Sequence, residues 1–289
     1  MSRWLFIPLA AVLAVPGCTG LVGPSAGGDA AAVLVGAGDI GWCGSPGAEE
    51  TARLLDGIPG IVFTAGDNAY FSGSPSEYRD CYDPWWGRHL SRTRPSAGNH
   101  DYETPGAAGY FAYYGALTGP AGLGYYSYAA GPWHVVVLNS NVSMAAGSPQ
   151  DQWLRGELGS HQASCVLAIW HHPLFSSGKH GNDLRSTDAW RALQSNGADL
   201  VINGHEHLYE RFAPQTADGM PDPRGLRQFT VGTGGAALYS FTTVRPNSEV
   251  RYNDSFGVLK MTLRNRGYDW EFVSTRQAIA DSGSASCTF

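Results

Sequence analysis

The feature that most constrains the fold of this sequence is a set of five short polar motifs, each of which comes directly after an apolar run. The runs have the length of buried strands, and helical patterns separate several of them. The motifs end at residues 41, 70, 101, 173 and 207. This alternation predicts an α/β fold, in which ligands bind beyond the carboxyl ends of the strands. We therefore expect the five motifs to converge on one site.

Each motif taken alone is weak evidence for a functional site. Gly-Asp or Gly-Asn after a strand is commonly a turn whose side chain bonds its own backbone, and a single His-x-His is commonly structural. Together, however, the motifs contribute seven oxygen and nitrogen donors and no thiolate: Asp39, Asp67, Tyr70, Asn99, His171, His205 and His207. Hard and borderline donors of this kind are typical of metal ligands.

The rest of the chain is consistent with one catalytic domain. Its 289 residues are 43% hydrophobic and 12% aromatic, enough to bury a sizeable core and to exclude disorder. The net charge of -6 provides no basic field for nucleic acid or for an acidic membrane surface. We expect helices at 49–55, 76–86 and 148–158, and strands at 31–36, 61–65, 125–128, 133–138, 166–170, 200–202, 229–231, 258–264 and 268–274.

The N-terminus has the pattern of an export signal. Arg3 precedes an apolar stretch, residues 4–15, that is too short to span a membrane. The stretch continues into Val-Pro-Gly-Cys at 15–18, which resembles a bacterial lipoprotein signal in which Cys18 is lipidated, although Pro16 departs from that pattern. Ordinary secretion is the alternative. We expect a signal peptide at 1–17, a flexible tether at 18–30 and a catalytic domain at 31–289.

The five motifs resemble those of the calcineurin-like metallophosphoesterase superfamily, and specifically of its purple acid phosphatase branch. That branch is marked by Gly-Asp-x-Gly, Gly-Asp-x-x-Tyr, Gly-Asn-His-Asp/Glu, a histidine after a strand and Gly-His-x-His, all of which occur here in order between Gly38 and His207. The resemblance implies a four-layer α/β/β/α sandwich in a single domain. We expect no counterpart of the N-terminal β-sandwich domain of plant members.

The resemblance also implies a binuclear metal centre. One ion would be bound by Asp39, Asp67, Tyr70 and His207, and the other by Asp67, Asn99, His171 and His205. Tyr70, otherwise a buried aromatic residue, would supply a phenolate suited to Fe(III). Asn99 would keep the second site divalent, with Fe, Zn or Mn as its ion.

A phosphatase reaction follows from the resemblance. A hydroxide bound by both ions would attack the phosphorus of a small phosphate monoester. His100 and His180 are the candidates for protonating the leaving group, and Asp101 is a candidate for orienting His100. His180 is otherwise an exposed loop residue, and Gly181 stands where plant members have a second histidine. If its strand continues that far, His172 would point to the face opposite His171, and we expect it to support a ligand or to be structural.

Two other functions remain open from the sequence. The same metal ligands would serve a phosphodiesterase or nucleotidase, since they determine the chemistry and not the leaving group. A non-catalytic metal-binding surface protein is the second alternative, although none of the seven ligands is missing. The sequence indicates no protein partner.

One of the five cysteines has a different expected role from the other four. Cys18 is the candidate for lipid attachment, and the remaining four allow three disulfide pairings. Cys43 and Cys81 follow the motifs of Asp39 and Asp67, so we expect them to pair. Cys165 and Cys287 would then join a strand to the end of the chain. Disulfides agree with an exported, extracellular or cell-envelope protein.

Overall fold

The computed structural model describes Met1 and residues 30–161, 165–276 and 279–288. Met1 apart, the expected signal peptide and Cys18 lie outside these residues, as does the tether except for Ala30, so the structure leaves those predictions as they stand. In the described part of the chain, no helix combines the length and the apolar character needed to cross a membrane.

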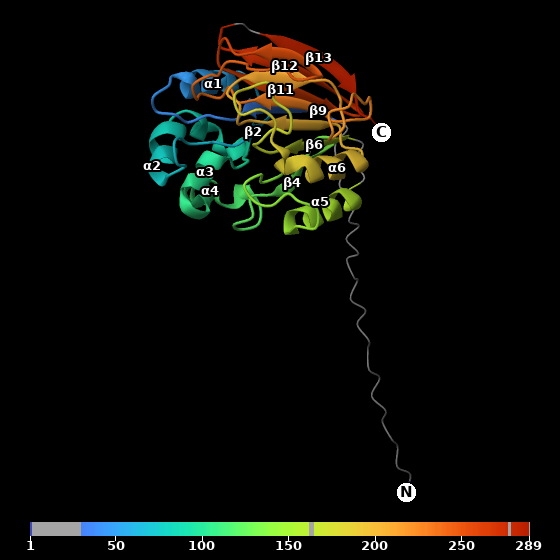
Figure 1. Cartoon of the computed structure of the whole chain (residues 1–289). Helices are drawn as coiled ribbons and strands as arrows, with labels where there is room; N and C mark the ends of the chain where they lie inside the picture. The colour runs from blue at the N-terminus through green and yellow to red at the C-terminus, as the bar shows by residue number, and fades with distance from the viewer. Residues whose placement is uncertain (2–29, 162–164, 277–278, 289) are drawn as a thin grey trace.

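The described residues form two sheets (Figure 1). The first has the order β13 (Asp281–Ser286), β12 (Gly267–Ser274), β11 (Gly257–Arg264), β1 (Ala32–Ala37), β2 (Ile61–Thr64) and β3 (Thr93–Arg94). The second has the order β10 (Ser248–Tyr252), β8 (Tyr209–Phe212), β9 (Arg227–Val231), β7 (Leu200–Asn203), β6 (Cys165–Ile169), β5 (Trp133–Val137) and β4 (Tyr126–Ala130). Two parallel groups, β1–β2–β3 and β5–β6–β7, therefore each present several carboxyl ends together.

The alternation of side chains on the strands places each sheet between two layers. On β6, Leu167 and Ile169 belong to the core shared with β1 and β11, whereas Val166 and Ala168 pack with α5 (Pro149–Ser160) and α6 (Thr187–Ser195). Helix α1 (Gly47–Asp56) packs against β11 of the first sheet. Figure 1 shows α5 and α6 on the side of the second sheet away from the first. The predicted α/β/β/α arrangement is confirmed.

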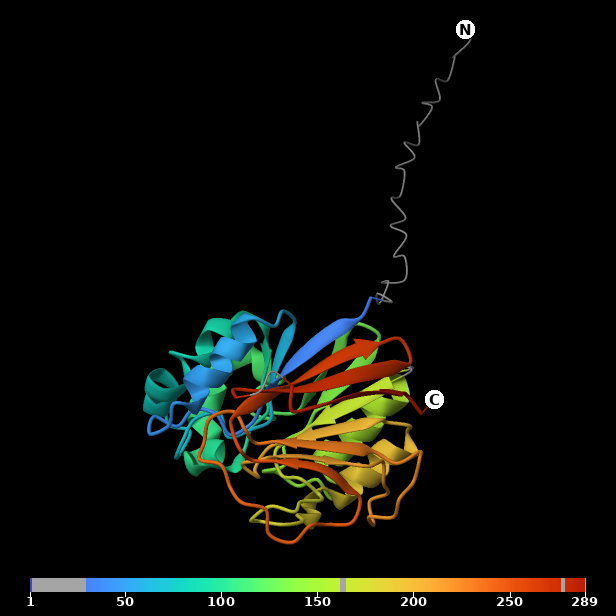
Figure 2. The ribbon, with the colours of Figure 1, turned by 90° about the horizontal axis from the view of Figure 1, so that it is seen from above.

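A helical region, residues 75–118, lies at one end of the two sheets (Figure 2). It comprises α2 (Pro75–Glu77), the π-helix η1 (Tyr78–Tyr82), the 3-10 helix η2 (Trp86–Arg92), α3 (Asn99–Glu103), η3 (Pro105–Ala107), α4 (Ala108–Tyr114) and η4 (Gly115–Thr118). The single helix expected at 76–86 is therefore wrong in detail. Tyr78 and Tyr82 pack on α4, and this tertiary packing accompanies the irregular helical turn.

Both expected disulfides are present. Cys43 bonds to Cys81 with their Cα atoms 4.8 Å apart, and Cys165 bonds to Cys287 with a Cα separation of 5.7 Å. The first joins the segment after β1 to η1, and the second joins the start of β6 to the C-terminal segment after β13.

Candidate metal centre

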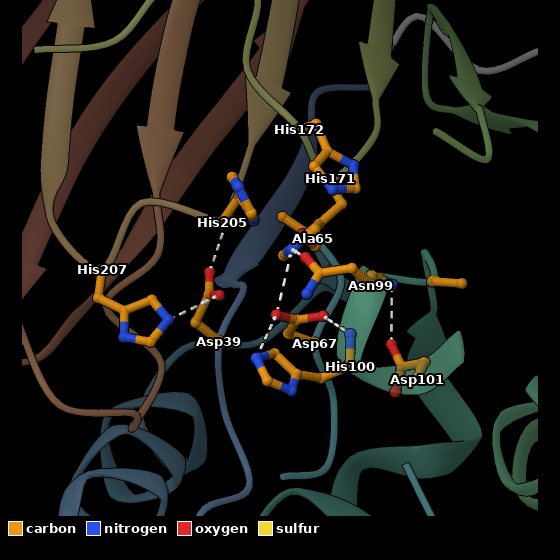
Figure 3. A network of polar contacts seen from close by, with 12 residues as sticks. Asp39, Ala65, Asp67, Asn99, His100, Asp101, His171, His172, His205 and His207 are labelled. Atoms are coloured by element: carbon orange, nitrogen blue, oxygen red, sulfur yellow. Dashed lines mark hydrogen bonds and ion pairs between the residues drawn. The ribbon is translucent and has the colours of Figure 1, made fainter. Parts of the chain in front are cut away.

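Seven polar side chains from five loops meet where strands of the two sheets end. Figure 3 labels these side chains with the exception of Tyr70. Three of the loops follow β1, β2 and β3 of the first sheet, and two follow β6 and β7 of the second. They carry, in order, Asp39; Asp67 and Tyr70; Asn99; His171; and His205 and His207. All seven are the donors singled out from the sequence, and the parallel pairing of the strands brings them together.

The backbone at this site is held in unusual conformations. Asp39, Asp67 and His205 have φ angles of 61°, 51° and 70°, in the left-handed region that non-glycine residues seldom adopt. Main-chain hydrogen bonds hold the first two loops against each other: Asp39 N–H donates to the Gly66 carbonyl at 2.9 Å, and Ile40 N–H donates to the Asp67 carbonyl at 3.0 Å. Conformations of this kind cluster at functional sites.

Asp39 is a fully buried carboxylate that contacts three other site residues. Its Oδ1 accepts a hydrogen bond from the Tyr70 hydroxyl at 2.8 Å and lies 3.3 Å from Nε2 of His207. Its Oδ2 accepts from the His205 main-chain N–H at 2.8 Å. Asp39 thus joins the β2 loop of the first sheet to the β7 loop of the second.

Asp67 lies between two groups of donors. Its Oδ2 is 3.1 Å from the Tyr70 hydroxyl on one side and 3.2 Å from His171 Nε2 on the other. Its Oδ1 accepts from the His100 main-chain N–H at 2.8 Å. Burial alone would raise the pKa of Asp67, but the neighbouring His171 and His100 outweigh it and lower the pKa well below its usual value. One carboxylate oxygen is therefore placed to face both groups.

The Tyr70 hydroxyl is enclosed by three partners. In addition to the two carboxylates, His207 Nε2 lies 3.0 Å from it. Burial, followed by the charges of Asp39 and Asp67, raises the pKa of Tyr70 well above its ordinary value. A strongly polarising cation would be needed to convert this phenol into a phenolate.

The rings of His171 and His207 are oriented by main-chain carbonyls. Nδ1 of His171 lies 2.7 Å from the Ala65 carbonyl, and Nδ1 of His207 lies 2.7 Å from the Ala237 carbonyl. Each Nδ1 thus donates, which turns each Nε2 toward a carboxylate. Burial lowers the pKa of His171, but Asp67 outweighs it and raises the pKa to about 9.

Asn99 and His205 complete the group on the side of the second sheet. The Asn99 amide oxygen lies 3.1 Å from His171 Nε2. The centroids of the His205 and His171 rings are 5.0 Å apart. Burial, together with the positive charges of His171 and His180, lowers the pKa of His205, so that its ring is neutral. Neutral imidazole is the form that binds metals.

The residues present fit a pair of metal ions. Two buried carboxylates, a phenol, an amide oxygen and three imidazoles form a set of oxygen and nitrogen donors, with one carboxylate shared. Two of the imidazoles donate from Nδ1 to main-chain carbonyls, which is the arrangement that supports metal-binding histidines. Asp39, Asp67 and His171 also have ligand atoms that lie within 4.8 Å of one another.

A family model described as "Calcineurin-like phosphoesterase" matches residues 33–209. The chain belongs to this family. The match covers more than half of the sequence and includes every motif described above. The match confirms the superfamily that was expected from the motifs.

Purple acid phosphatases are among the proteins similar to this phosphoesterase. It is 26% identical over 237 residues to purple acid phosphatase 15 of Arabidopsis thaliana, a match that covers 68% of the chain and 44% of the plant protein. It is 30% identical over 272 residues to an uncharacterized protein of Mycobacterium tuberculosis, covering 77% and 51%. The phosphoesterase thus spans about half the length of these relatives.

Two solved structures share the fold. The purple acid phosphatase PPD1 of yellow lupin superposes with a TM-score of 0.72 at 19% identity, covering 90% of this chain and 54% of that one. GAP50, described as the anchor in the inner membrane complex of Plasmodium, superposes with a TM-score of 0.67 at 14% identity, covering 90% of each chain.

His100 lies beside the shared carboxylate of the phosphoesterase. Its Nε2 is 4.0 Å from Asp67 Oδ2, and its Nδ1 is 2.6 Å from the Phe71 carbonyl. The side chain of His100 is 31% exposed, so it can reach a substrate.

The Asp101 carboxylate is bonded to residues other than His100, which it was expected to orient. Its fully buried carboxylate accepts hydrogen bonds from Gly98 N–H at 2.8 Å, from the Asn68 amide at 2.9 Å and from the Tyr78 hydroxyl at 2.6 Å. The ring of His100 is oriented instead by the Phe71 carbonyl. The structure thus corrects the expectation that Asp101 orients His100: Asp101 positions the Asp67 and Asn99 loops.

His180 lies beside His205 at the candidate metal centre. Its ring centroid is 4.4 Å from that of His205, and its Nδ1 is 3.5 Å from Oε2 of the buried Glu206. The same glutamate accepts hydrogen bonds from the main-chain N–H groups of His180 and Gly181 at 2.7 and 2.9 Å. Glu206 thus anchors the loop that carries His180.

Sequence reasoning missed Glu206 and Tyr239 at this site. Glu206 stands inside the Gly-His-x-His motif, so its position between two ligands was an available signal. The Tyr239 ring stacks on His207 with centroids 4.1 Å apart and an interplanar angle of 12°. Nothing local in the sequence marks Tyr239, because it reaches the site from a distant loop.

His172 is closer to the site than expected. Strand β6 ends at Ile169, so the alternation of strand faces does not extend to His172. Its ring lies 4.5 Å from the His205 ring between centroids, and its Nδ1 is 2.8 Å from the Ser140 hydroxyl. The condition for an opposite face, a strand that continues to His172, is therefore not met, while the contact with Ser140 supports a structural role.

Proposed function

We propose that this phosphoesterase is an exported, binuclear metal-dependent phosphatase that hydrolyses phosphate monoesters. The observation that carries the proposal is the position of Asp67 Oδ2, which faces the Tyr70 hydroxyl at 3.1 Å and His171 Nε2 at 3.2 Å. A shared carboxylate between two donor groups is what a pair of metal ions requires. The similarity to purple acid phosphatases supports the same reaction.

Two groups of residues would hold the ions. Asp39, Asp67, Tyr70 and His207 would bind Fe(III), and Asp67, Asn99, His171 and His205 would bind a divalent ion, Fe, Zn or Mn. When bound, the two ions would acidify a water molecule and neutralise charge on the phosphoryl oxygens. Tyr70 supports the assignment of the trivalent ion, because a phenolate is a hard, anionic donor.

Residues of the chain itself would bind and orient the substrate and protonate its leaving group. His100 lies beside Asp67 and His180 beside His205, and their side chains are 31% and 39% exposed, so that either could deliver a proton to the leaving oxygen. The rings of His171 and His207 are fixed in direction by hydrogen bonds from Nδ1 to main-chain carbonyls, which keeps the group preorganised for a small phosphorylated substrate.

Metal analysis combined with p-nitrophenyl phosphate turnover tests the proposal. We expect two metal ions per chain, a purple colour that is lost on reduction, and loss of metal and turnover in Asp67→Ala. Asp218→Ala, at a highly exposed carboxylate, is the matched control and should retain both. A chain without metal, or an Asp67→Ala variant with full turnover, would overturn the proposal.

A phosphodiesterase or nucleotidase activity is distinguished by comparing p-nitrophenyl phosphate with bis-p-nitrophenyl phosphate under the same conditions. A non-catalytic surface protein would show no turnover of either compound despite bound metal. The likeness to GAP50 bears on the fold alone and does not favour that alternative.

Export is supported by the two disulfides, which persist in oxidising compartments. We further propose that a lipid on Cys18 anchors the protein to a membrane. Mass spectrometry of the N-terminal peptide would test it: a diacylglyceryl group on Cys18 supports anchoring, and an unmodified cysteine contradicts it.

A further inference from the structure

A second cluster of metal-ligating side chains lies where α5 meets the second sheet. It consists of His134 on β5 together with Glu157 and His161 at the C-terminal end of α5, a helix found beside β4 in Figure 1. One ligand atom from each residue lies within 4.8 Å of the others. His134 pairs with Val166 near the start of β6, whereas His171 of the candidate metal centre follows the end of β6. The cluster is therefore at the opposite end of these strands.

The distances from the Glu157 carboxylate to the two imidazole nitrogens match tetrahedral coordination. Glu157 Oε1 is 3.4 Å from His134 Nε2 and 3.3 Å from His161 Nδ1. Ligands bound at 2.0 to 2.1 Å to a tetrahedral zinc ion are separated by about 3.3 to 3.4 Å. The hydroxyl of Ser127 on β4 also donates to this Glu157 oxygen, which fixes the position of the carboxylate.

His134 provides independent evidence for a ligand. Its side chain is only 4% exposed, and its Nε2 is a buried nitrogen without a hydrogen-bond partner, although Glu157 Oε1 lies 3.4 Å away. A buried polar atom left unpaired in this way costs about 1 to 3 kcal/mol. Burial also lowers the pKa of His134, so the ring is neutral and can coordinate.

The surroundings favour a cation. His161 is the residue that caps the C-terminus of α5, where the helix dipole and free carbonyls attract positive charge. Its Nδ1 is 3.0 Å from the Glu157 main-chain carbonyl. The rings of His161 and His134 stack with centroids 4.0 Å apart and an interplanar angle of 15°, so the exposed His161 ring must turn out of the stack for both rings to face one ion.

We propose that His134, Glu157 and His161 bind a zinc ion at a site separate from the candidate metal centre. Two imidazoles and a carboxylate form a ligand set suited to zinc, and the 48% exposure of His161 leaves the fourth position to water. The ion joins the end of α5 to β5. Because it binds the folded chain, it raises the melting temperature.

The test uses zinc alone, in two measurements. Crystals soaked in a zinc salt should show an anomalous difference peak among the three side chains. Equilibrium dialysis should show one equivalent of zinc per chain lost in His161→Gln and in His134→Gln, together with the zinc-dependent rise in melting temperature. His161 is exposed, so its variant keeps the test valid if the buried substitution prevents folding.

Two controls separate this site from the rest of the molecule. His89 also lies beside a single carboxylate, Asp56, and its Nε2 is likewise buried and unpartnered, but it lacks a third donor, so His89→Gln should lose no zinc. Asp67→Ala should lose metal from the candidate centre and keep the peak at His134. Absence of that peak at saturating zinc, or equal zinc binding by wild type and His161→Gln, would overturn the proposal.

Discussion

At the residue scale, glycines of the polar motifs lie where ligand side chains pack so closely against the backbone that a Cβ atom would not fit. A Cβ atom on Gly98 would lie 2.1 Å from Asp67 Oδ1, and one on Gly66 would lie 2.4 Å from His171 Nδ1. Contacts this short are essentially never seen for real Cβ atoms. Loops without side chains at these positions therefore allow the donors to converge.

We expect Gly98→Ala to remove the candidate centre without unfolding the chain. The new methyl group must displace Asp67, so metal content and p-nitrophenyl phosphate turnover should fall at least tenfold, as when a metal ligand's support is removed. Gly156→Ala is the matched control, because a Cβ there meets nothing within 4 Å. Gly156→Ala should keep both properties and gain about 0.5 to 1 kcal/mol of stability, since alanine favours helix. Unchanged metal binding in Gly98→Ala would contradict this account.

His100 and His180, the two candidate acids, can be tested with substrates that differ in their leaving group. His100→Gln should lower kcat for an alkyl phosphate by about 100-fold, because an alkoxide needs a proton to leave. It should lower kcat much less for p-nitrophenyl phosphate, whose leaving group departs as a stable anion. His180→Gln is measured in parallel, and His89→Gln serves as the control. An equal loss with both substrates in His100→Gln would exclude His100 as the acid.

The residues that converge at the site could be predicted from sequence because each belongs to a local motif that follows a strand. Asp39 and His205 are examples, separated by 166 positions and joined by a hydrogen bond of 2.8 Å. Contacts from irregular loops, such as that of Tyr239, have no periodic or local signal. The direction of the Asp101 carboxylate was equally hidden, since it depends on Tyr78 and Asn68 in other segments.

At the element scale, strand β13 shows how a segment with weak strand propensity joins a sheet. Its sequence, Asp-Ser-Gly-Ser-Ala-Ser, lacks the β-branched and aromatic residues typical of strands. The Asp281 carboxylate instead accepts from the Tyr209 hydroxyl at 2.7 Å, from Arg211 Nε at 2.8 Å and from Trp270 Nε1 at 3.1 Å. Tyr209 and Arg211 belong to β8, so Asp281 joins the edge strand of the first sheet to the second sheet.

We expect Asp281→Ala to lower the free energy of unfolding by about 3 kcal/mol, because it leaves a largely buried arginine without its main partner. The side chains of Asp281 and Arg211 are 8% and 12% exposed. Glu249 also contacts Arg211, which places the loss at the lower end of the range for buried pairs. Urea unfolding measures the change. The exposed Asp254→Ala is the control, and a loss as small as that of the control would contradict the role of Asp281.

Elements with periodic apolar patterns were predictable, and those formed by tertiary contact were not. Strand β12 alternates buried and half-buried positions along its whole length, as its sequence indicates. Strands β8 and β10 were missed because they are short and carry charged residues that pair between strands, as Arg211 and Glu249 do. Helix α6 was missed although its buried face, which includes Trp190 and Leu193, has helical spacing.

At the scale of the whole molecule, the two disulfides restrain different parts of the chain. The Cys43–Cys81 bond spans 38 positions and joins segments that flank the Asp39 and Asp67 loops. The Cys165–Cys287 bond spans 122 positions and fastens the C-terminus to β6. Asp199 reinforces that end, because it accepts hydrogen bonds from the Thr288 N–H at 2.6 Å and hydroxyl at 2.7 Å. The first bond therefore restrains loops of the candidate metal centre, and the second restrains the C-terminal segment against the second sheet.

This division predicts different phenotypes for the two double variants. By restricting the unfolded chain, the longer loop contributes up to about 5 kcal/mol and the shorter up to about 4 kcal/mol. Cys165→Ser/Cys287→Ser should therefore lose more stability in urea yet retain metal during dialysis against a weak chelator. Cys43→Ser/Cys81→Ser should lose less stability but release metal faster, because the Asp39 and Asp67 loops are no longer tied at their rim. Equal metal retention in both double variants would show that strand packing alone positions the ligands.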